Sequence, residues 1–461
     1  MKYTKIYLAG LLAASCLLGS CEKDFLDKQP LDKISDATVW TDFALAEAYL
    51  NNIYTGLPNG FQRSYYMLES ATDNSDNTYQ WTDAEKFNFG DYNPSGYPTF
   101  GVPWSVDGNE SWGDGPWPIY YNYIRRANIF LARVDEVPGD KVQIDRLKGE
   151  AKFLRALFYH ELSRLYGGVP IVTEALGVED LDAMLTPRNT YEETVNFILK
   201  ELDEATTLLP DTRYLGRAVQ TSALALKGRV LLYAGSPQFN NGGFNVAHLT
   251  ASAAASKAVI DKGTYSLFPN YGNLFLAANN NNVEVIFDNQ YKQGIRGHYV
   301  DQFNTPIEIG GGWGGTAPTQ NLVDKYEMTD GKLYNESPLF SPVAPYVNRD
   351  PRFYASIFYD GAQWGDRTIA TRVGGLNGID GGANGTNADA TKTGYYMRKF
   401  LDPANTNELY RGGGSSYNNW IIIRLAEVLL NYAEAQNEAV GPDASVYDAV
   451  NMIRARPGVN L

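Results

Sequence analysis

Apolar residues recur along the chain at spacings of three and four over several long stretches. In the clearest of these, six apolar side chains repeat in this way: Leu147, Ala151, Leu154, Phe158, Leu162 and Leu165. The spacing places them on one face of an amphipathic helix. Gly167, Gly168 and Pro170 come directly afterwards and predict that the helix ends there.

The same periodicity predicts seven further helices. Their approximate ranges are 41–56, 115–135, 190–209, 219–234, 246–262, 420–439 and 443–456. Several follow one another with short connections, and such pairs resemble tetratricopeptide-type units, although the letters show no clean period. We therefore predict a mainly α fold, in which tetratricopeptide-like helix pairs form a scaffold with minor β structure.

Two long stretches lack helical periodicity. Residues 57–118 and 263–419 are rich in Gly, Asn, Pro and aromatic residues, with a short strand-like run, "VEVIFD", at 283–288. Loops of this length are usually functional or disordered, and their high aromatic content argues against disorder. The pattern predicts an ordered, loop-rich and aromatic-rich ligand-binding face on the helical scaffold.

The amino terminus has the layout of a secretory signal. Lys2 and Lys5 precede an apolar stretch from residue 6 to residue 18, which is too short to span a bilayer. Gly19 and Ser20 then stand directly before Cys21, as a lipoprotein cleavage site requires. The thiol of Cys21 would accept a diacylglyceryl group, so we expect lipidation at Cys21.

A disulfide between Cys16 and Cys21 is the alternative, but Cys16 lies inside the segment that cleavage removes. We therefore expect the following organisation. Residues 1–20 are the signal peptide, 21–40 a tether, and 41–461 a single body made of an amino-terminal helical part (41–262), a loop-rich insert (263–419) and a carboxyl-terminal helix pair (420–461).

Composition and charge narrow the function classes. Hydrophobic residues make up 44% of the chain and charged residues 20%, as in an ordinary globular protein. The 53 acidic residues exceed the 39 basic ones, which gives a net charge of −14. Because such a surface repels phosphate groups, nucleic-acid partners are not expected.

Enzyme signatures are largely missing from the sequence. The three histidines, His160, His248 and His298, are far apart, and no nucleophile elbow or phosphate-binding Walker loop is present. "GGGWGG" at 310–315 matches a dinucleotide-binding spacing but lacks the βαβ context, and it is interpreted as a loop presenting Trp313. No carboxylate pair is singled out for glycoside hydrolysis. We expect no enzyme activity, catalytic residue, metal or cofactor.

Two local patterns have less specific interpretations. "DNSDNT" at 73–78 resembles the start of a calcium loop, but it lacks the turn glycine and the final glutamate of an EF-hand. Arg424, Glu427, Asn431 and Glu434 recur at helical spacing, which predicts ion pairs within one helix at a packing seam.

Aromatic residues gather between Phe61 and Tyr120. This segment holds four of the eight tryptophans, Trp81, Trp104, Trp112 and Trp117, among many Asn and Asp residues. Flat aromatic faces beside polar groups suit sugars, which have apolar C–H faces and hydroxyl rims. The alternative is a small core beneath a long loop. A sparser second set comprises Tyr291, Tyr299, Trp313 and Trp364.

Four stretches together resemble the SusD/RagB family of nutrient-uptake lipoproteins. They are "CEKDFLD" at 21–27, "KGEAKFLRALFYHELSRLYGGVPIV" at 148–172, "ALALKGRVLLYAG" at 223–235, and "IIIRLAEVLLNYAEAQNEA" followed by "AVNMIRARPG" within 421–458. The resemblance implies a fold with four tetratricopeptide-like helix pairs. It also implies an outer-membrane location facing the cell exterior, with a SusC-like TonB-dependent transporter as partner.

In such a pair the lipoprotein captures glycan and delivers it to the barrel without performing chemistry. The resemblance further implies that Glu22, Lys23 and Asp24 form a surface-export signal. By position, the ligand-binding residues are expected to be Asp73, Asn77, Trp81, Trp112, Tyr291 and Trp313.

The sequence departs from the family pattern at its end. Family members usually continue well past the "IRARPG" helix, so we expect that the usual carboxyl-terminal stretch is lacking after Leu461. Three alternatives stay open: a surface glycosidase, a binder of another nutrient such as peptides, and a scaffold whose helix pairs hold other proteins.

Overall fold

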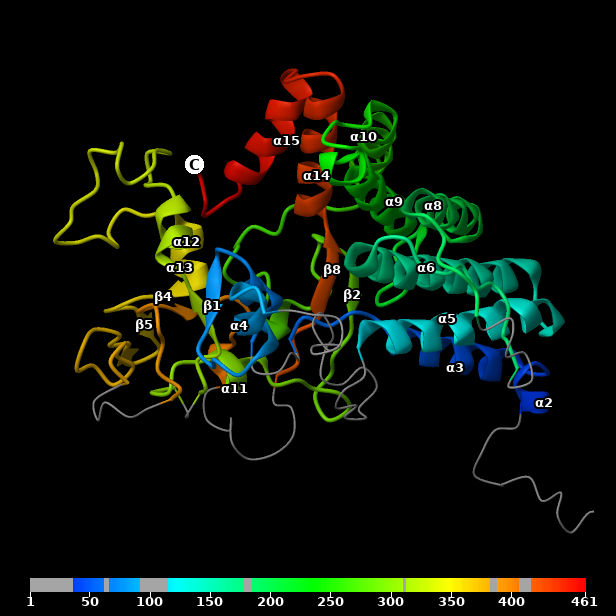
Figure 1. Cartoon of the computed structure of the whole chain (residues 1–461), viewed down its shortest axis with the longest axis horizontal. Helices are drawn as coiled ribbons and strands as arrows, with labels where there is room; N and C mark the ends of the chain where they lie inside the picture. Colours follow the sequence, from blue (N-terminus) through cyan, green and yellow to red (C-terminus); the bar gives the residue numbers. More distant parts are fainter. Residues whose placement is uncertain are drawn as a thin grey trace, which may run out of the picture.

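The computed structural model describes residues 36–61, 66–91, 115–177, 185–309, 312–381, 388–405 and 416–461. These residues form a helical half and a loop-rich half. In Figure 1 the long helices (cyan, green and red) lie on one side, and the short strands and loops (mostly yellow and orange) lie on the other.

The helical half follows the predicted helix ranges closely. Its elements are α2 (Asp36–Val39), α3 (Phe43–Tyr54), α5 (Pro116–Arg133), α6 (Lys141–Tyr166), α8 (Tyr191–Leu208), α9 (Gln220–Gly235), α10 (Val246–Asp261), α14 (Leu425–Ala439) and α15 (Ala444–Arg454). Along the series from α5 to α15 each helix packs against the next. The predicted arrangement of tetratricopeptide-like helix pairs is confirmed.

Local chemistry fixes where these helices begin and end. Thr190 and Glu193 form a reciprocal capping box at the start of α8: the Glu193 N–H donates to Thr190 Oγ1 (3.1 Å), and the Thr190 N–H donates to Glu193 Oε2 (2.8 Å). Asp140 caps α6, and Gly167 ends it with a φ of +71°, a conformation that glycine adopts without strain.

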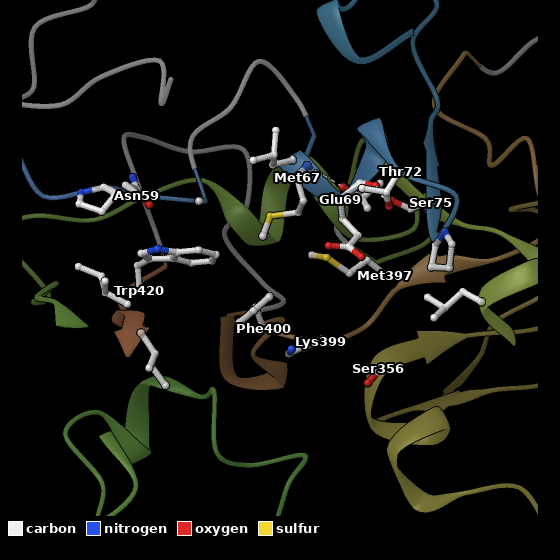
Figure 2. A pocket seen from close by; sticks show the side chains of 18 of the residues that line it. Asn59, Met67, Glu69, Thr72, Ser75, Ser356, Met397, Lys399, Phe400 and Trp420 are labelled. Carbon is white, nitrogen blue, oxygen red and sulfur yellow. Dashed lines mark hydrogen bonds between the residues drawn. The ribbon is translucent and has the colours of Figure 1, made fainter. Parts of the chain in front are cut away.

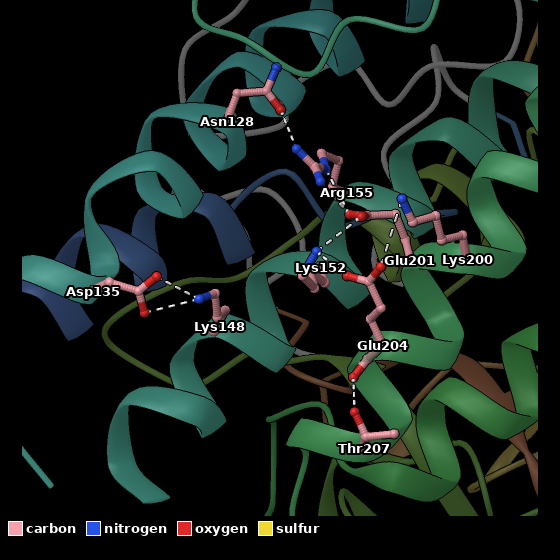
Figure 3. Close-up of polar contacts among 9 residues, drawn as sticks. All are labelled: Asn128, Asp135, Lys148, Lys152, Arg155, Lys200, Glu201, Glu204 and Thr207. Carbon is pink, nitrogen blue, oxygen red and sulfur yellow. Dashed lines mark hydrogen bonds and ion pairs between the residues drawn. The ribbon is translucent and has the colours of Figure 1, made fainter. Parts of the chain in front are cut away.

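Buried ion pairs tie neighbouring helices together. Arg155 of α6 lies 2.6 Å from a carboxylate oxygen of Glu201 in α8, and its Nη1 donates to Asn128 of α5 at 2.8 Å (Figure 3). Lys152 reaches the same carboxylate at 3.2 Å. Because both partners are buried and hydrogen-bonded, this network fixes the relative position of the three helices.

One large apolar core fills the helical half. The predicted apolar face of α6 belongs to it, through Leu147, Ala151, Leu154, Phe158 and Leu162, all of which are buried. The loop-rich half has a second core of its own, which contains Phe61, Met67, Val300, Phe358, Trp364 and Tyr396. Over the described residues, the loops of this half pack around this second core.

The loop-rich half contains short elements only. Its helices are η2 (Leu68–Ala71), α4 (Asp83–Asn88), η5 (Ala277–Asn279), α11 (Val300–Asn304), α12 (Gln320–Lys325), α13 (Pro351–Ser356) and η6 (Pro403–Asn405); η3 (Val134–Glu136) and η4 (Pro237–Phe239) connect helices of the other half. Its strands are β1 (Ser75–Asn77), β3 (Thr316–Pro318), β4 (Ile357–Phe358), β5 (Gln363–Trp364), β6 (Arg367–Thr368) and β7 (Tyr396–Met397). They form the antiparallel pairs β1–β3, β4–β7 and β5–β6.

One predicted helix starts too early. Residues 420–424 form strand β8 (Trp420–Arg424), which pairs antiparallel with β2 (Val285–Asn289), so α14 begins only at Leu425. The run of three isoleucines favours a strand, because β-branched side chains pack well on a pleated surface. The strand predicted at 283–288 is confirmed, and it supplies the partner.

The predicted ion pairs within one helix are also corrected. Arg424 belongs to β8 and pairs with Glu284 at 2.7 Å, whereas Glu427 of α14 pairs with Arg229 of α9 at 2.6 Å. These contacts join different elements and not successive turns of one helix. Among the helices in the described ranges, none is long and apolar enough to cross a bilayer.

Candidate functional site

The two loop segments that the sequence singled out lie against each other. In the β1–β3 pair, Asn77 stands opposite Thr316. The contact continues beyond the strands, where the Thr78 N–H donates to the carbonyl oxygen of Gly315 at 3.1 Å and Thr78 Oγ1 donates to that of Gly314 at 2.6 Å. Segments separated by more than 200 positions thereby pack directly against each other.

The glycines around Trp313 allow its loop to pack this closely. Gly314 has a φ of +55°, and a Cβ there would come within 2.5 Å of the Tyr396 ring. A Cβ on Gly312 would lie 2.0 Å from Thr305 Oγ1. Gly312 and Gly314 therefore allow close backbone packing, and Trp313 between them, whose ring is half-buried against Phe303, lies at the surface.

Tyr79 joins this loop to a third segment. Its hydroxyl lies 2.9 Å from the carbonyl oxygen of Trp313 and 2.5 Å from Oδ1 of Asp389. The ring of Trp81 packs beside that of Tyr79, with 5.7 Å between centroids, and 59% of Trp81 remains exposed. Tyr79, Trp81, Trp313 and Asp389 are called the aromatic surface below.

The short helix α4 follows Trp81 and extends the exposed apolar area. Phe87 is 44% exposed and Phe89 is 73% exposed. Large exposed aromatic side chains are uncommon on a protein surface without a partner, and grouped beside acceptor groups they are typical of a recognition site.

A buried carboxylate lies beneath this part of the structure. Glu85 of α4 is 3% exposed, and burial, together with the neighbouring Asp76, raises its pKa to about 7. Lys392 lies 3.6 Å away and opposes this shift only in part. The stability of this region is therefore expected to depend on pH near neutrality.

The predicted ligand-binding residues have different environments. Asp73 is exposed in the turn before β1, and its carbonyl oxygen accepts from Thr319 at 2.6 Å. Trp81 and Trp313 belong to the aromatic surface. Trp112 and Cys21 lie outside the described residues.

Asn77 and Tyr291 are enclosed by other residues. Asn77 is fully buried, and its Oδ1 accepts from the Tyr79 N–H at 2.8 Å, so it supports the aromatic surface from below. Tyr291 is 5% exposed and packs edge-on against Phe61 and His298. Trp364 is likewise buried in the second core. The sequence identifies these polar and aromatic side chains, but it does not show which of them are covered by other residues in the fold.

Sequence reasoning missed Tyr79 as an anchor and did not find Asp389. Tyr79 was only one aromatic residue in a rich segment, and Asp389 stands in a Gly-, Asn- and Thr-rich loop without any recognisable pattern. Their proximity depends on three distant segments meeting in space, for which a single sequence contains no signal.

The buried histidines do not offer acid–base chemistry at neutral pH. Burial lowers the pKa of both His160 and His298 to about 3. The interpretation of His160 as a packed residue is confirmed, since it lies inside α6 and its ring faces that of Tyr233. Within the described ranges, no cluster of three or more His, Cys, Asp or Glu side chains is arranged to hold a metal ion.

The fold and the aromatic surface define a tetratricopeptide-like scaffold with an elaborate loop face. Two family models match successive parts of the chain: "Starch-binding associating with outer membrane" covers residues 24–232, and "SusD family" covers residues 283–461. A solved SusD-like protein from Bacteroides fragilis is 31% identical, with a TM-score of 0.75 over 94% of this chain and 82% of that chain. The chain belongs to the SusD family.

Other relatives agree with this assignment. A SusD-like protein of Bacteroides ovatus is 24% identical over 99% of this chain and 77% of its own length. A solved laminarin-binding SusD-like protein shares the fold, with 23% identity and a TM-score of 0.67 over 91% of this chain and 85% of that chain. The family resemblance drawn from the sequence is confirmed.

Proposed function

We propose that this protein is a cell-surface glycan-binding lipoprotein, which captures oligosaccharides and delivers them to a SusC-like TonB-dependent transporter in the outer membrane. The observation that carries the proposal is the exposed ring of Trp81, which packs against Tyr79, whose hydroxyl in turn lies within hydrogen-bonding distance of the Trp313 carbonyl oxygen. A sugar stacks its C–H face on such a ring, while Asp389 and nearby hydroxyl groups accept or donate hydrogen bonds at its rim.

The comparisons support the ligand class. One matching family description contains the words "starch-binding", and one relative with the same fold binds laminarin, so both point to carbohydrate. Function by binding alone, without catalysis, agrees with the neutral buried histidines and with the absence of an enzyme signature in the sequence.

A binding screen tests the aromatic surface. Affinity gel electrophoresis and titration calorimetry are carried out with a polysaccharide panel that includes starch and laminarin. Trp81→Ala is expected to weaken binding of the best glycan by roughly tenfold, because it removes the exposed stacking face. Tyr447→Ala, which removes a similarly exposed aromatic from α15, serves as the matched control and should bind normally.

The outcomes separate the alternatives. Binding to none of the glycans, or an unchanged affinity in Trp81→Ala, contradicts the proposed site. Release of reducing ends from a bound polysaccharide supports the glycosidase, and binding to peptides from a protein digest supports uptake of a different nutrient.

The anchor and the partner are tested in cells. Labelled palmitate is expected in the full chain and not in Cys21→Ala, which should appear in the soluble fraction, whereas Cys16→Ala should stay with the membrane. Purification of the anchored protein should bring down a TonB-dependent barrel. Recovery of other proteins without a barrel supports the scaffold alternative.

A further inference from the structure

A second candidate site lies between the helical half and the loop-rich half. It is a cavity of about 670 Å³, within the range of roughly 300–1,000 Å³ typical of small-ligand sites. Its walls come from both halves, including α6 and α9 on one side and β7, β8 and the segment 67–75 on the other. None of the residues of the aromatic surface lines it, although the β1–β3 pair borders both.

One wall of the cavity is aromatic and held in place. The ring of Trp420 lies against Gly60, where an added Cβ would come within 2.3 Å of the indole. Phe61 meets the same indole edge-on at 5.0 Å, and Phe400 lies 5.9 Å from it. In Figure 2, Trp420 and Phe400 line the same part of the cavity, which gives a bound ring an apolar face.

Lys399 adds a positive charge next to this wall. Its Nζ lies 5.0 Å from the centroid of the Phe400 ring and 4.5 Å from that of Phe275. Two other cations of the cavity are neutralised, since Arg164 pairs with Glu161 and Arg229 pairs with Glu427. Among the residues that the structure describes, no carboxylate forms an ion pair with Lys399.

The pKa of the neighbouring Tyr271 shows the effect of this positive electrostatic potential. Burial by itself raises the pKa of a tyrosine, yet Lys399 and Arg424 hold the pKa of Tyr271 below its ordinary value. An oxygen that carries negative charge is therefore favoured in this part of the cavity.

Polar groups stand on the opposite wall. Figure 2 shows Glu69, Thr72 and Ser75 across the cavity from Lys399 and Ser356. Hydroxyl and carboxylate groups of this kind donate to and accept from sugar hydroxyls. A flat apolar wall, a rim of hydroxyl partners and one unneutralised cation are the features that a charged sugar ring requires.

We propose that this cavity is a second ligand site, which binds a uronic-acid-containing oligosaccharide with its carboxylate beside Lys399 and a sugar face on Trp420 and Phe400. The proposal extends the proposed function by naming a glycan class, but it stands on residues separate from the aromatic surface.

Titration calorimetry with trigalacturonic acid, and with neutral galactotriose for comparison, tests the charge selection. The charged trisaccharide is expected to bind the unmodified chain at least about tenfold more tightly than the neutral one. Lys399→Gln should remove that preference, and Lys399→Arg should keep most of it. Lys325→Gln, which removes an exposed lysine at the end of α12, is the control for net charge and should behave like the parent chain. Equal affinity for the two sugars, or an unchanged preference in Lys399→Gln with a normal thermal transition, overturns the proposal.

Two further arms separate this proposal from its neighbours. Trp81→Ala should bind trigalacturonic acid normally, because the aromatic surface and the cavity share no residue. If the unmodified chain binds no neutral glycan of the panel but binds trigalacturonic acid in a Lys399-dependent manner, the proposed function alone is contradicted. If it binds a neutral glycan through Trp81 but shows no preference for the uronate, the cavity alone is contradicted. A triglutamate peptide that binds as tightly as the uronate, with the same dependence on Lys399, overturns the assignment to a sugar.

Discussion

The hydroxyl of Tyr79 lies 2.5 Å from Oδ1 of Asp389, a residue 310 positions later in the chain. The same hydroxyl lies 2.9 Å from the carbonyl oxygen of Trp313, so one phenol connects three segments of the aromatic surface. Trp81 packs on the ring of that phenol. The orientation of the exposed tryptophan therefore depends on a hydrogen bond that it does not itself form.

Tyr79→Phe tests this dependence. The change keeps the ring but removes the hydrogen bond to Asp389, so we expect glycan binding to weaken by roughly three- to tenfold, with a loss of about 1 kcal/mol in the free energy of unfolding. Calorimetry with the best glycan from the panel and urea denaturation measure the two effects. Tyr447→Phe is the control, and equal affinities in both variants would show that the hydroxyl does not position the surface.

Gly314→Ala tests the close packing of the loop that carries Trp313. Its φ of +55° and the 2.5 Å approach of a Cβ to Tyr396 predict a loss of about 2–5 kcal/mol in the free energy of unfolding. Gly294 has a φ of +77° but no atom within 4 Å of an added Cβ, so Gly294→Ala should cost only about 1–2 kcal/mol. Urea denaturation measures both variants. A similar loss in the two would mean that backbone strain, and not packing, sets the requirement for glycine.

Glu85→Gln tests the pH dependence of the region under the aromatic surface. The unfolded carboxyl ionises near its ordinary pKa of 4.5, while the pKa in the folded chain is about 7. The folded state thus holds the proton over this window, and the contribution of Glu85 to stability is present below pH 4.5 and is lost as the pH rises to 7. We expect Glu85→Gln to remove this fall and to be more stable than the parent chain above pH 7.

Urea denaturation between pH 4.5 and pH 8 provides the measurement. Glu336→Gln, at an exposed position in the loop-rich half, is the matched control and should leave the profile of the parent chain unchanged. If the stability of Glu85→Gln changes with pH in parallel with that of the parent chain, Glu85 is not the source of the pH dependence.

Glu284→Gln tests the buried charge that joins the last helix to the body. Glu284 is fully buried and contacts Arg456 at 2.6 Å and Arg424 at 2.7 Å. Because Arg456 is itself buried, loss of the carboxylate leaves a buried cation unpaired, with an expected loss of about 3–5 kcal/mol in the free energy of unfolding. The exposed pair of Lys257 and Asp261 gives the comparison, and Asp261→Asn should cost less than about 1 kcal/mol. Comparable losses on urea denaturation would refute the role of burial.

The helical half was largely predictable from the sequence. Apolar spacing on α6 and capping residues such as Thr190 are local signals, and they gave helix ranges that the structure confirms. The early start predicted for the helix at 420 shows the limit of such signals. An apolar run fits a buried strand as well as a helix, and only the presence of β2 beside Trp420–Arg424 decided between them.

The candidate site was predictable in part. Aromatic enrichment and the loop glycines pointed to Trp81 and Trp313, which the structure connects through Tyr79. The same enrichment also selected Tyr291, which is enclosed by other rings, because composition does not distinguish a covered ring from an exposed one.

By itself the sequence determined the helix pairs, the family and the segments that carry the aromatic surface, since those depend on residues close together in the chain. Only the tertiary structure decided which rings are exposed, that Asp389 meets Tyr79, and that Lys399 faces a cavity between the two halves. Contacts across hundreds of residues follow from how the two cores pack together, and that packing has no local periodicity from which it can be read.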